Sequence, residues 1–121
     1  MRAFLNIAKA LSDPARLRVL LALGGGELCL CHFIALLKLS PSTVSKHLDL
    51  LYQAGLVERR KEGRWCYFRL AGRDAGPAVQ AALRWMETAL GEGTEARADG
   101  ARVRRLRVAD RKELAGCYKG S

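Results

Sequence analysis

Residues 40–70 constrain the fold more than any other segment of this 121-residue chain. Ser40 and Pro41 together mark a helix start, because a serine side chain caps the first backbone N–H groups and proline fits the first turn. Gly55 marks the helix end, because glycine tolerates the left-handed conformation found there. The segment therefore predicts a helix over about residues 41–54.

This expected helix is amphipathic, and a hairpin follows it. Val44, Leu48 and Leu51 form an apolar stripe, and polar residues fall on the other side: Ser42, Ser45, Lys46, Asp49 and Gln53. Two strand-like runs come next, residues 56–60 and 64–70, joined by Lys61, Glu62 and Gly63. A helix followed at once by such a hairpin is typical of a winged helix-turn-helix.

Three further helices are expected before residue 40. The apolar positions recur at helical spacing in residues 2–11, 14–23 and 28–38. The second of these begins with Pro14 after a capping-type residue and ends at three glycines. The third stops near Leu39 and, with the helix over 41–54, completes the helix-turn-helix.

The C-terminal part divides into a helix and a tail. Residues 75–90 predict a fifth helix with an apolar stripe that includes Val79, Leu83 and Met86. Residues 91–100 are polar and contain glycine, which predicts a flexible link to a basic tail with weak helical character. The expected fold is mainly α with a small β-hairpin, in the order α-α-α-α-β-β-α, with one domain over 1–90 and a linker and tail over 91–121.

The charge balance favours a polyanionic partner. The formal net charge is +9 and the pI is near 10.0, so nucleic acid is the first candidate and an anionic membrane the second. A merely basic soluble protein has the same composition. The chain lacks an apolar run long enough for a membrane span, and charges interrupt its N-terminus too early for a signal peptide. These features predict a cytoplasmic protein whose cysteines are thiols or metal ligands.

The expected recognition helix and wing carry residue types that contact DNA. Small hydroxyls and a lysine lie at the helix start, and arginines cluster at the hairpin, giving these candidates: Ser42, Thr43, Ser45, Lys46, His47, Arg59, Arg60, Lys61 and Arg64. His47 lies on the flank of the apolar stripe, where a structural histidine and a phosphate contact are equally compatible with the pattern. The tail arginines of residues 102–111 form either a solvated face or additional DNA contacts.

Three motifs resemble the ArsR/SmtB family of metal-responsive winged-helix repressors. They are ALSDPARLRVLLAL at 10–23, ELCLC at 27–31, and the stretch from Ser40 to Leu70. The resemblance implies a homodimer that binds an inverted repeat in operator DNA. It also implies a dimer surface formed by the first and fifth helices, for which the candidates are Phe4, Ile7, Val79, Leu83 and Met86.

Within that family, ELCLC is similar to the thiol sensor of the arsenic-type repressors. The resemblance implies a repressor that releases DNA when As(III) or Sb(III) binds cysteine thiolates, with no enzymatic activity and no organic cofactor. Cys29 and Cys31 are two such ligands. Because residues i and i+2 of a regular helix point apart, their joint chelation of one ion is expected to unwind the start of the third helix.

The third ligand departs from the family pattern. Ile34 stands where the arsenic motif has its third cysteine. The remaining candidates are Cys117 in the tail, which completes the predicted metal set of Cys29, Cys31 and Cys117, or Cys66 in the second strand, or an external thiol. A site with only two thiolates is the other possibility. His32 is adjacent and is expected to be an exposed histidine.

Other functions compete with arsenic sensing. A sulfur-rich site also accepts Cd(II) or Pb(II), whereas the absence of histidine from residues 73–90 argues against a zinc site on the fifth helix. Oxidation of either cysteine is an alternative trigger for a repressor. A thiol enzyme is disfavoured, because Cys31 and His32 are helical neighbours whose side chains diverge. A non-specific basic binder is the last alternative.

Overall fold

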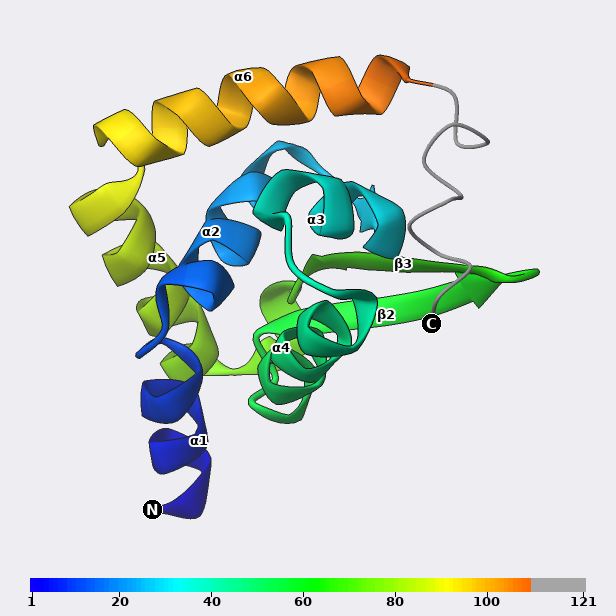
Figure 1. The fold of residues 1–121 in the computed structure, drawn as a ribbon. Coiled ribbons are helices and arrows are strands. Elements are labelled where there is room, and N and C mark those ends of the chain that lie inside the picture. The colour runs from blue at the N-terminus through cyan, green and yellow to red at the C-terminus, as the bar shows by residue number, and fades with distance from the viewer. Residues whose placement is uncertain (110–121) are drawn as a thin grey trace.

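The protein is a winged helix-turn-helix, as predicted, seen in a computed structural model that describes residues 1–109 (Figure 1). A three-stranded antiparallel sheet has the strand order β1-β3-β2. Figure 1 shows α2 and α3 between α6 on one side and α4 with the sheet on the other, while α1 lies beside α5. The elements are α1 Arg2–Ala10, α2 Pro14–Ala22, a 3-10 turn Leu23–Gly25, β1 Leu28–Cys29, α3 Leu30–Leu37, α4 Pro41–Gln53, β2 Val57–Glu62, β3 Trp65–Leu70, a 3-10 turn Arg73–Ala75, α5 Pro77–Leu90 and α6 Thr94–Val108.

The predicted helix starts of α2 and α4 are confirmed. The Asp13 carboxylate accepts the backbone N–H groups of Ala15 and Arg16 at 2.8 and 3.3 Å, immediately before α2. Burial raises the pKa of Asp13, but these two hydrogen bonds and the nearby positive charge of Arg16 together hold that pKa below its usual value. The Ser40 hydroxyl accepts the N–H of Thr43 at 3.3 Å and caps α4 in the same way.

The start of the third helix was predicted wrongly. Residues 28 and 29 form β1 and pair with β3, in which Leu28 faces Phe68 and Cys29 faces Tyr67. Cys29 has an extended backbone (φ −81°, ψ 154°) and is the N-cap of α3. The side chain of Leu28 is fully buried, and the strand pairing satisfies backbone groups that a longer helix would have used. The sheet therefore has a third strand in addition to the hairpin.

The hairpin turn is tighter than expected. Glu62 faces Trp65 in the register of β2 and β3, so the connection is the two residues Gly63 and Arg64. Gly63 has φ +62°, a conformation that glycine adopts without strain. Lys61 and Glu62 accordingly belong to β2.

The core lies between the helices and the sheet. Val44, Leu48 and Leu51 are buried, which confirms the predicted inner face of α4. Phe33 of α3 meets Phe68 of β3 edge to face, with ring centroids 6.2 Å apart. This packing fixes the position of α3 relative to both α4 and the wing.

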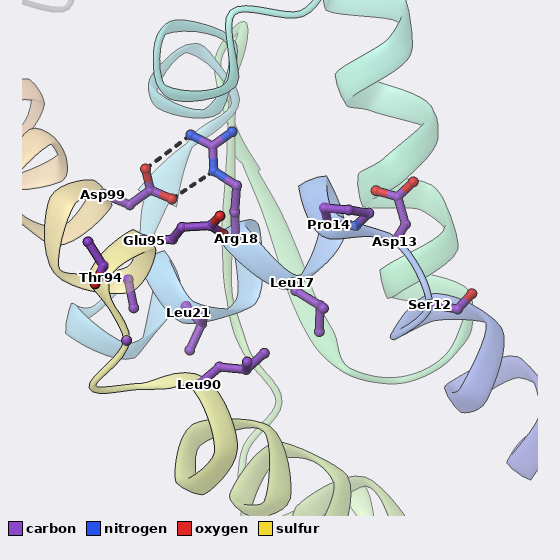
Figure 2. Close-up of a pocket in the computed structure, with 12 residues that line it drawn as sticks. Ser12, Asp13, Pro14, Leu17, Arg18, Leu21, Leu90, Thr94, Glu95 and Asp99 are labelled. Atoms are coloured by element: carbon purple, nitrogen blue, oxygen red, sulfur yellow. Dashed lines mark hydrogen bonds and ion pairs between the residues drawn. The ribbon is translucent and has the colours of Figure 1, made fainter.

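The flexible link expected after residue 90 is replaced by a packed helix. Helix α6 begins at Thr94 and packs on α2 and α3. Ala96, Asp99, Gly100, Val103 and Leu106 recur at helical spacing and are buried or half-buried. A search for apolar residues at helical spacing does not detect this buried stripe, because its centre is the charged residue Asp99. In the structure, the Asp99 carboxylate is paired with Arg18 of α2 (Figure 2). Residues 110–121 of the predicted tail lie outside the described residues.

Candidate functional site

The polar face of α4 begins with a cluster of hydroxyl groups. Ser40 Oγ lies 2.8 Å from Thr43 Oγ1 and 3.4 Å from Ser42 Oγ, and these side chains are exposed. Lys46 is exposed one turn further on, and Ser45 is half-buried. Unpaired backbone N–H groups and the positive end of the helix dipole make this helix start attractive to phosphate. The face has the chemistry of a DNA-recognition helix.

His47 is held by the protein itself. Nη1 of Arg16 lies 3.1 Å from Nδ1 of His47. Because a guanidinium group can only donate hydrogen bonds, Nδ1 of His47 is the acceptor. The same guanidinium group donates to the carbonyl oxygens of Ala10 and Lys9 at 2.9 and 3.0 Å. His47 therefore belongs to a junction that joins α4 to α2 and the end of α1, and the structure favours the structural role over the phosphate contact.

The wing arginines lie over aromatic rings. Arg59 has its guanidinium carbon 3.9 Å from the Tyr52 ring centroid and donates to Asp49 at 3.3 Å. Arg64, in the turn, lies 5.3 Å from the Trp65 ring. The rings hold exposed cations along the hairpin, where they can follow a DNA backbone.

The Arg60 side chain binds two carboxylates of the protein itself. Its Nε and Nη2 donate to the two carboxylate oxygens of Glu27 at 2.9 and 2.7 Å, and its Nη1 donates to Glu62 at 3.1 Å. The hydrogen bond from Arg60 holds the pKa of Glu27 below its usual value. The sequence shows Glu27 only as the first residue of the ELCLC motif, because its partner Arg60 is 33 residues away.

The two motif cysteines are brought together and buried. Both are fully inaccessible, and their sulfur atoms are 2.8 Å apart, with the Cys31 thiol donating to Cys29. The backbone N–H of Cys31 also points at the Cys29 sulfur, at 3.4 Å. This hydrogen bond to Cys29, together with burial, raises the pKa of Cys31. The expected divergence of the two side chains is wrong, because Cys29 precedes α3 instead of lying in it.

His32 is not the exposed histidine that was expected. It is half-buried, and its Nδ1 accepts the backbone N–H of Cys29 at 3.0 Å. The Cys29 sulfur in turn accepts a backbone N–H group of the first turn of α3. The two side chains therefore form a capping box at the start of this helix. His32 thus orients the backbone of a candidate ligand.

The third ligand is not among the residues around the pair. Ile34 is buried in the core, and Cys66 is a half-buried residue of β3 whose pKa is raised by burial. Within residues 1–109, no group of three or more His, Cys, Asp or Glu side chains is placed to hold an ion. Cys117 lies outside the described residues.

The candidate dimer residues divide between core and surface. Ile7, Val79 and Met86 are buried within the chain's own core and are not the free surface that was expected, although Ile7 also lines the groove described next. Phe4 is 69% exposed, and Trp85, which was not among the candidates, is 70% exposed. Both line an apolar groove of about 360 Å³ between α1 and α5. Leu83 is half-buried.

The fold and this arrangement define a class: a DNA-binding transcription regulator of the winged helix-turn-helix type. The family model described as "Bacterial regulatory protein, arsR family" matches residues 13–59. A homodimeric winged helix-turn-helix DNA-binding domain from Mycobacterium bovis, Mb0332, is 30% identical, covers 73% of this chain and 79% of that one, and has a TM-score of 0.62. The chain belongs to the arsR family of bacterial transcription regulators, and it is not an enzyme.

Curated relatives carry different names within that family. An uncharacterized HTH-type transcriptional regulator of Methanocaldococcus jannaschii, MJ1325, is 44% identical over 52% of this chain and 72% of its own length. The arsenical resistance operon repressor of Escherichia coli K12 is 40% identical over 55% of this chain and 58% of its own. A cadmium resistance transcriptional regulatory protein, the CadC homolog of Staphylococcus aureus, is 36% identical over 64% of this chain and 65% of its own length. None of the helices described in residues 1–109 is long and apolar enough to cross a membrane.

Proposed function

We propose that the chain is an arsenite- and antimonite-responsive repressor whose sensor is the thiol pair Cys29 and Cys31. The observation that carries the proposal is the 2.8 Å approach of the two sulfur atoms in a buried site. Soft ions prefer sulfur ligands, and two converged thiols are already a chelating pair. Each As–OH bond of arsenous acid exchanges for an As–S bond, the thiol proton leaves with the hydroxide as water, and arsenic keeps its oxidation state.

Ligand binding must move the pair apart. An ion bound at roughly 2.3 Å from each of two sulfurs, with an angle of about 90–110° between them, holds those sulfurs about 3.3–3.8 Å apart. They start at 2.8 Å, in a site without accessible surface. Because Cys31 belongs to α3 and Cys29 to β1, the displacement falls on the element that packs against α4 and on the strand that pairs with the wing. This strain is the proposed cause of DNA release.

Cys117 is the proposed third ligand. The Arg107 side chain reaches Glu27, with its Nη1 2.9 Å from the Glu27 carbonyl oxygen, so the end of α6 lies near the thiol pair. Cys117 follows Arg107 by ten positions in the sequence. A chain of that length spans at most about 35 Å, which is ample to reach the pair.

A second ligand class competes for the same site. The CadC homolog is named for cadmium resistance, and Cd(II) also prefers thiolates. Peroxide is a weaker candidate, because the thiolate is the reactive species and the pKa of Cys31 is raised. Cadmium-dependent release is therefore the alternative to test.

We also propose that the repressor acts as a homodimer on an inverted repeat. The exposed apolar side chains of Phe4 and Trp85 suit a second copy, and the related Mb0332 domain is described as homodimeric. Each α4 then enters one half-site, and the exposed arginines and lysine of the wing follow the backbone. The domain that does this extends to the end of α6 because that helix packs on α2 and α3.

The test is operator release followed by fluorescence anisotropy, with DNA from upstream of the chain's own gene. Arsenite is expected to release the wild type but not the Cys29→Ser or Cys31→Ser variants, and Cys117→Ser is expected to need more arsenite. Cys66→Ser, which changes a half-buried thiol outside the pair, is the matched control and should behave as the wild type. An intact wild-type complex at saturating arsenite contradicts the proposal, and release by Cd(II) alone favours the alternative.

A further inference from the structure

The segment just before the thiol pair is held from two sides. Glu27, two residues ahead of Cys29, presents its carboxylate to Arg60 of β2. From the other side, Arg107 of α6 donates to the carbonyl oxygens of Glu27 and Gly26 at 2.9 and 3.0 Å. The backbone is tied to one element and the side chain to another.

The ion pair of Glu27 and Arg60 crosses the whole sheet. In the order β1-β3-β2, Tyr67 of the middle strand faces Cys29 on one side and Arg60 on the other. The Arg60 guanidinium lies 4.5 Å from the Tyr67 ring centroid and continues to Glu27. The outer strand of the wing is therefore linked directly to the residues that lead into the sensor.

We propose that the ion pair of Glu27 and Arg60 is the link through which ligand binding at Cys29 and Cys31 repositions the wing. Both are positioning residues: neither binds the ion, and Arg60 orients the hairpin instead of serving chiefly as a phosphate contact. The inference rests on the proposed sensing function. It assigns to the wing a coupling route separate from that through α3 and α4.

The geometry makes this link sensitive to small movements. Charge-assisted hydrogen bonds of 2.7 and 2.9 Å are near their optimum and weaken steeply when the atoms separate or tilt. The two sulfurs must separate by roughly 0.5–1 Å for an ion to bind between them. Arg107 restrains the carbonyl groups of Gly26 and Glu27, so the loop before Cys29 can move little when the sulfurs separate. The movement is therefore expected to change the hydrogen bonds between Glu27 and Arg60.

The pair contributes little to folding, so its role is visible in coupling and not in stability. Arg60 and Glu27 have side chains that are 52% and 30% exposed, and ion pairs at such sites stabilise a fold only weakly. Glu62 offers a matched control. It binds the same guanidinium group from within β2 and does not reach the sensor segment.

The experiment measures operator affinity with and without saturating arsenite, and takes the ratio as the coupling. Couplings of this kind are roughly 5–150-fold. In Glu27→Gln the ratio is expected to fall at least threefold below the wild type, whereas Glu62→Gln should stay within twofold. Arg60→Lys keeps the charge but cannot bridge both oxygens, so it should lose coupling while its salt dependence of DNA binding is unchanged. Arsenite affinity without DNA is measured for each variant and should not change.

The outcomes separate this inference from the proposed function. An unchanged ratio in Glu27→Gln, with a wild type that arsenite does release, overturns the link alone. If arsenite fails to release the wild type, the proposed function fails, and the comparison is repeated with phenylarsine oxide, which needs only two thiols. Wild-type release by that probe with a reduced ratio in Glu27→Gln supports the link, and no release overturns it.

Discussion

Arg18 and Asp99 form a bidentate ion pair that joins α2 to α6, in which Nε donates to Oδ2 at 2.7 Å and Nη2 donates to Oδ1 at 3.0 Å (Figure 2). Asp99 lies at the centre of the buried stripe of α6, and its side chain is 12% exposed. The hydrogen bond to Asp99 raises the pKa of Arg18. Since a buried carboxylate without its partner is costly, this pair should help to keep α6 packed on α2.

Removing one partner should loosen α6 and lower stability. We expect Arg18→Leu to reduce the free energy of unfolding by about 1–3 kcal/mol, less than for a fully buried pair because Arg18 is partly exposed. Urea denaturation measures the change. Arg69→Ala, which breaks the exposed pair with Glu58, is the control and should cost less than about 1 kcal/mol. Equal losses in both variants would show that α6 does not depend on this contact.

Lys46 should contribute one phosphate contact to operator binding. In Lys46→Ala we expect weaker binding and a slope of log K against log salt that is lower by about one unit. The control is Arg97→Ala, which removes an exposed cation from α6, on the side of the molecule away from α4 (Figure 1). A slope change in Arg97→Ala equal to that in Lys46→Ala would place the DNA elsewhere.

Trp85 should be needed for self-association. The proposed dimer covers this side chain, which is 70% exposed in the single chain, and a charge there would be buried without a partner. We expect Trp85→Glu to shift the protein to a monomer in sedimentation experiments at micromolar concentration and to weaken operator binding. Val108→Glu adds the same charge at an 86% exposed position on α6 and should leave the dimer intact. A dimeric Trp85→Glu protein would exclude this surface.

Local signals predicted the helix-turn-helix well. Ser40 with Pro41, Asp13 with Pro14, and the stripe of Val44, Leu48 and Leu51 each act within a few residues. The interactions that define these helices lie within each segment, so the predicted bounds of α2 and α4 agree with the observed ones to within about a residue. The same holds for the existence of the wing, although not for its turn.

Long-range pairing was not predictable in the same way. Cys29 leaves the helix because β3, whose Tyr67 it faces, is 38 residues ahead, and no pattern near Cys29 signals that partner. Asp99 and Glu27 look like solvated charges until Arg18 and Arg60 are placed beside them. The convergence of the thiols follows from the position of Cys29 in β1, which is why the expected divergence of the two side chains was wrong.

The protonation state of Cys31 predicts that pH affects the affinities for the two candidate ligands differently. Its raised pKa keeps the thiol protonated at neutral pH. Arsenous acid takes up a protonated thiol and releases water, so no net proton is lost and its affinity should change little between pH 6 and 8. Cd(II) must displace the proton of each thiol, so its affinity should rise about tenfold per pH unit for every protonated ligand.

Calorimetry at three pH values in two buffers of different ionisation enthalpy measures both affinity and proton release. Cys31→Ser should lower the cadmium pH slope by about one unit, because one displaced proton is removed. If Cys31 were ionised at neutral pH, the signs would differ: arsenite would consume a proton per thiolate and bind more weakly as pH rises, while the contribution of Cys31 to the cadmium slope would vanish. A falling arsenite affinity from pH 6 to 8 would therefore refute the protonated thiol pair and, with it, the hydrogen bond that joins Cys31 to Cys29.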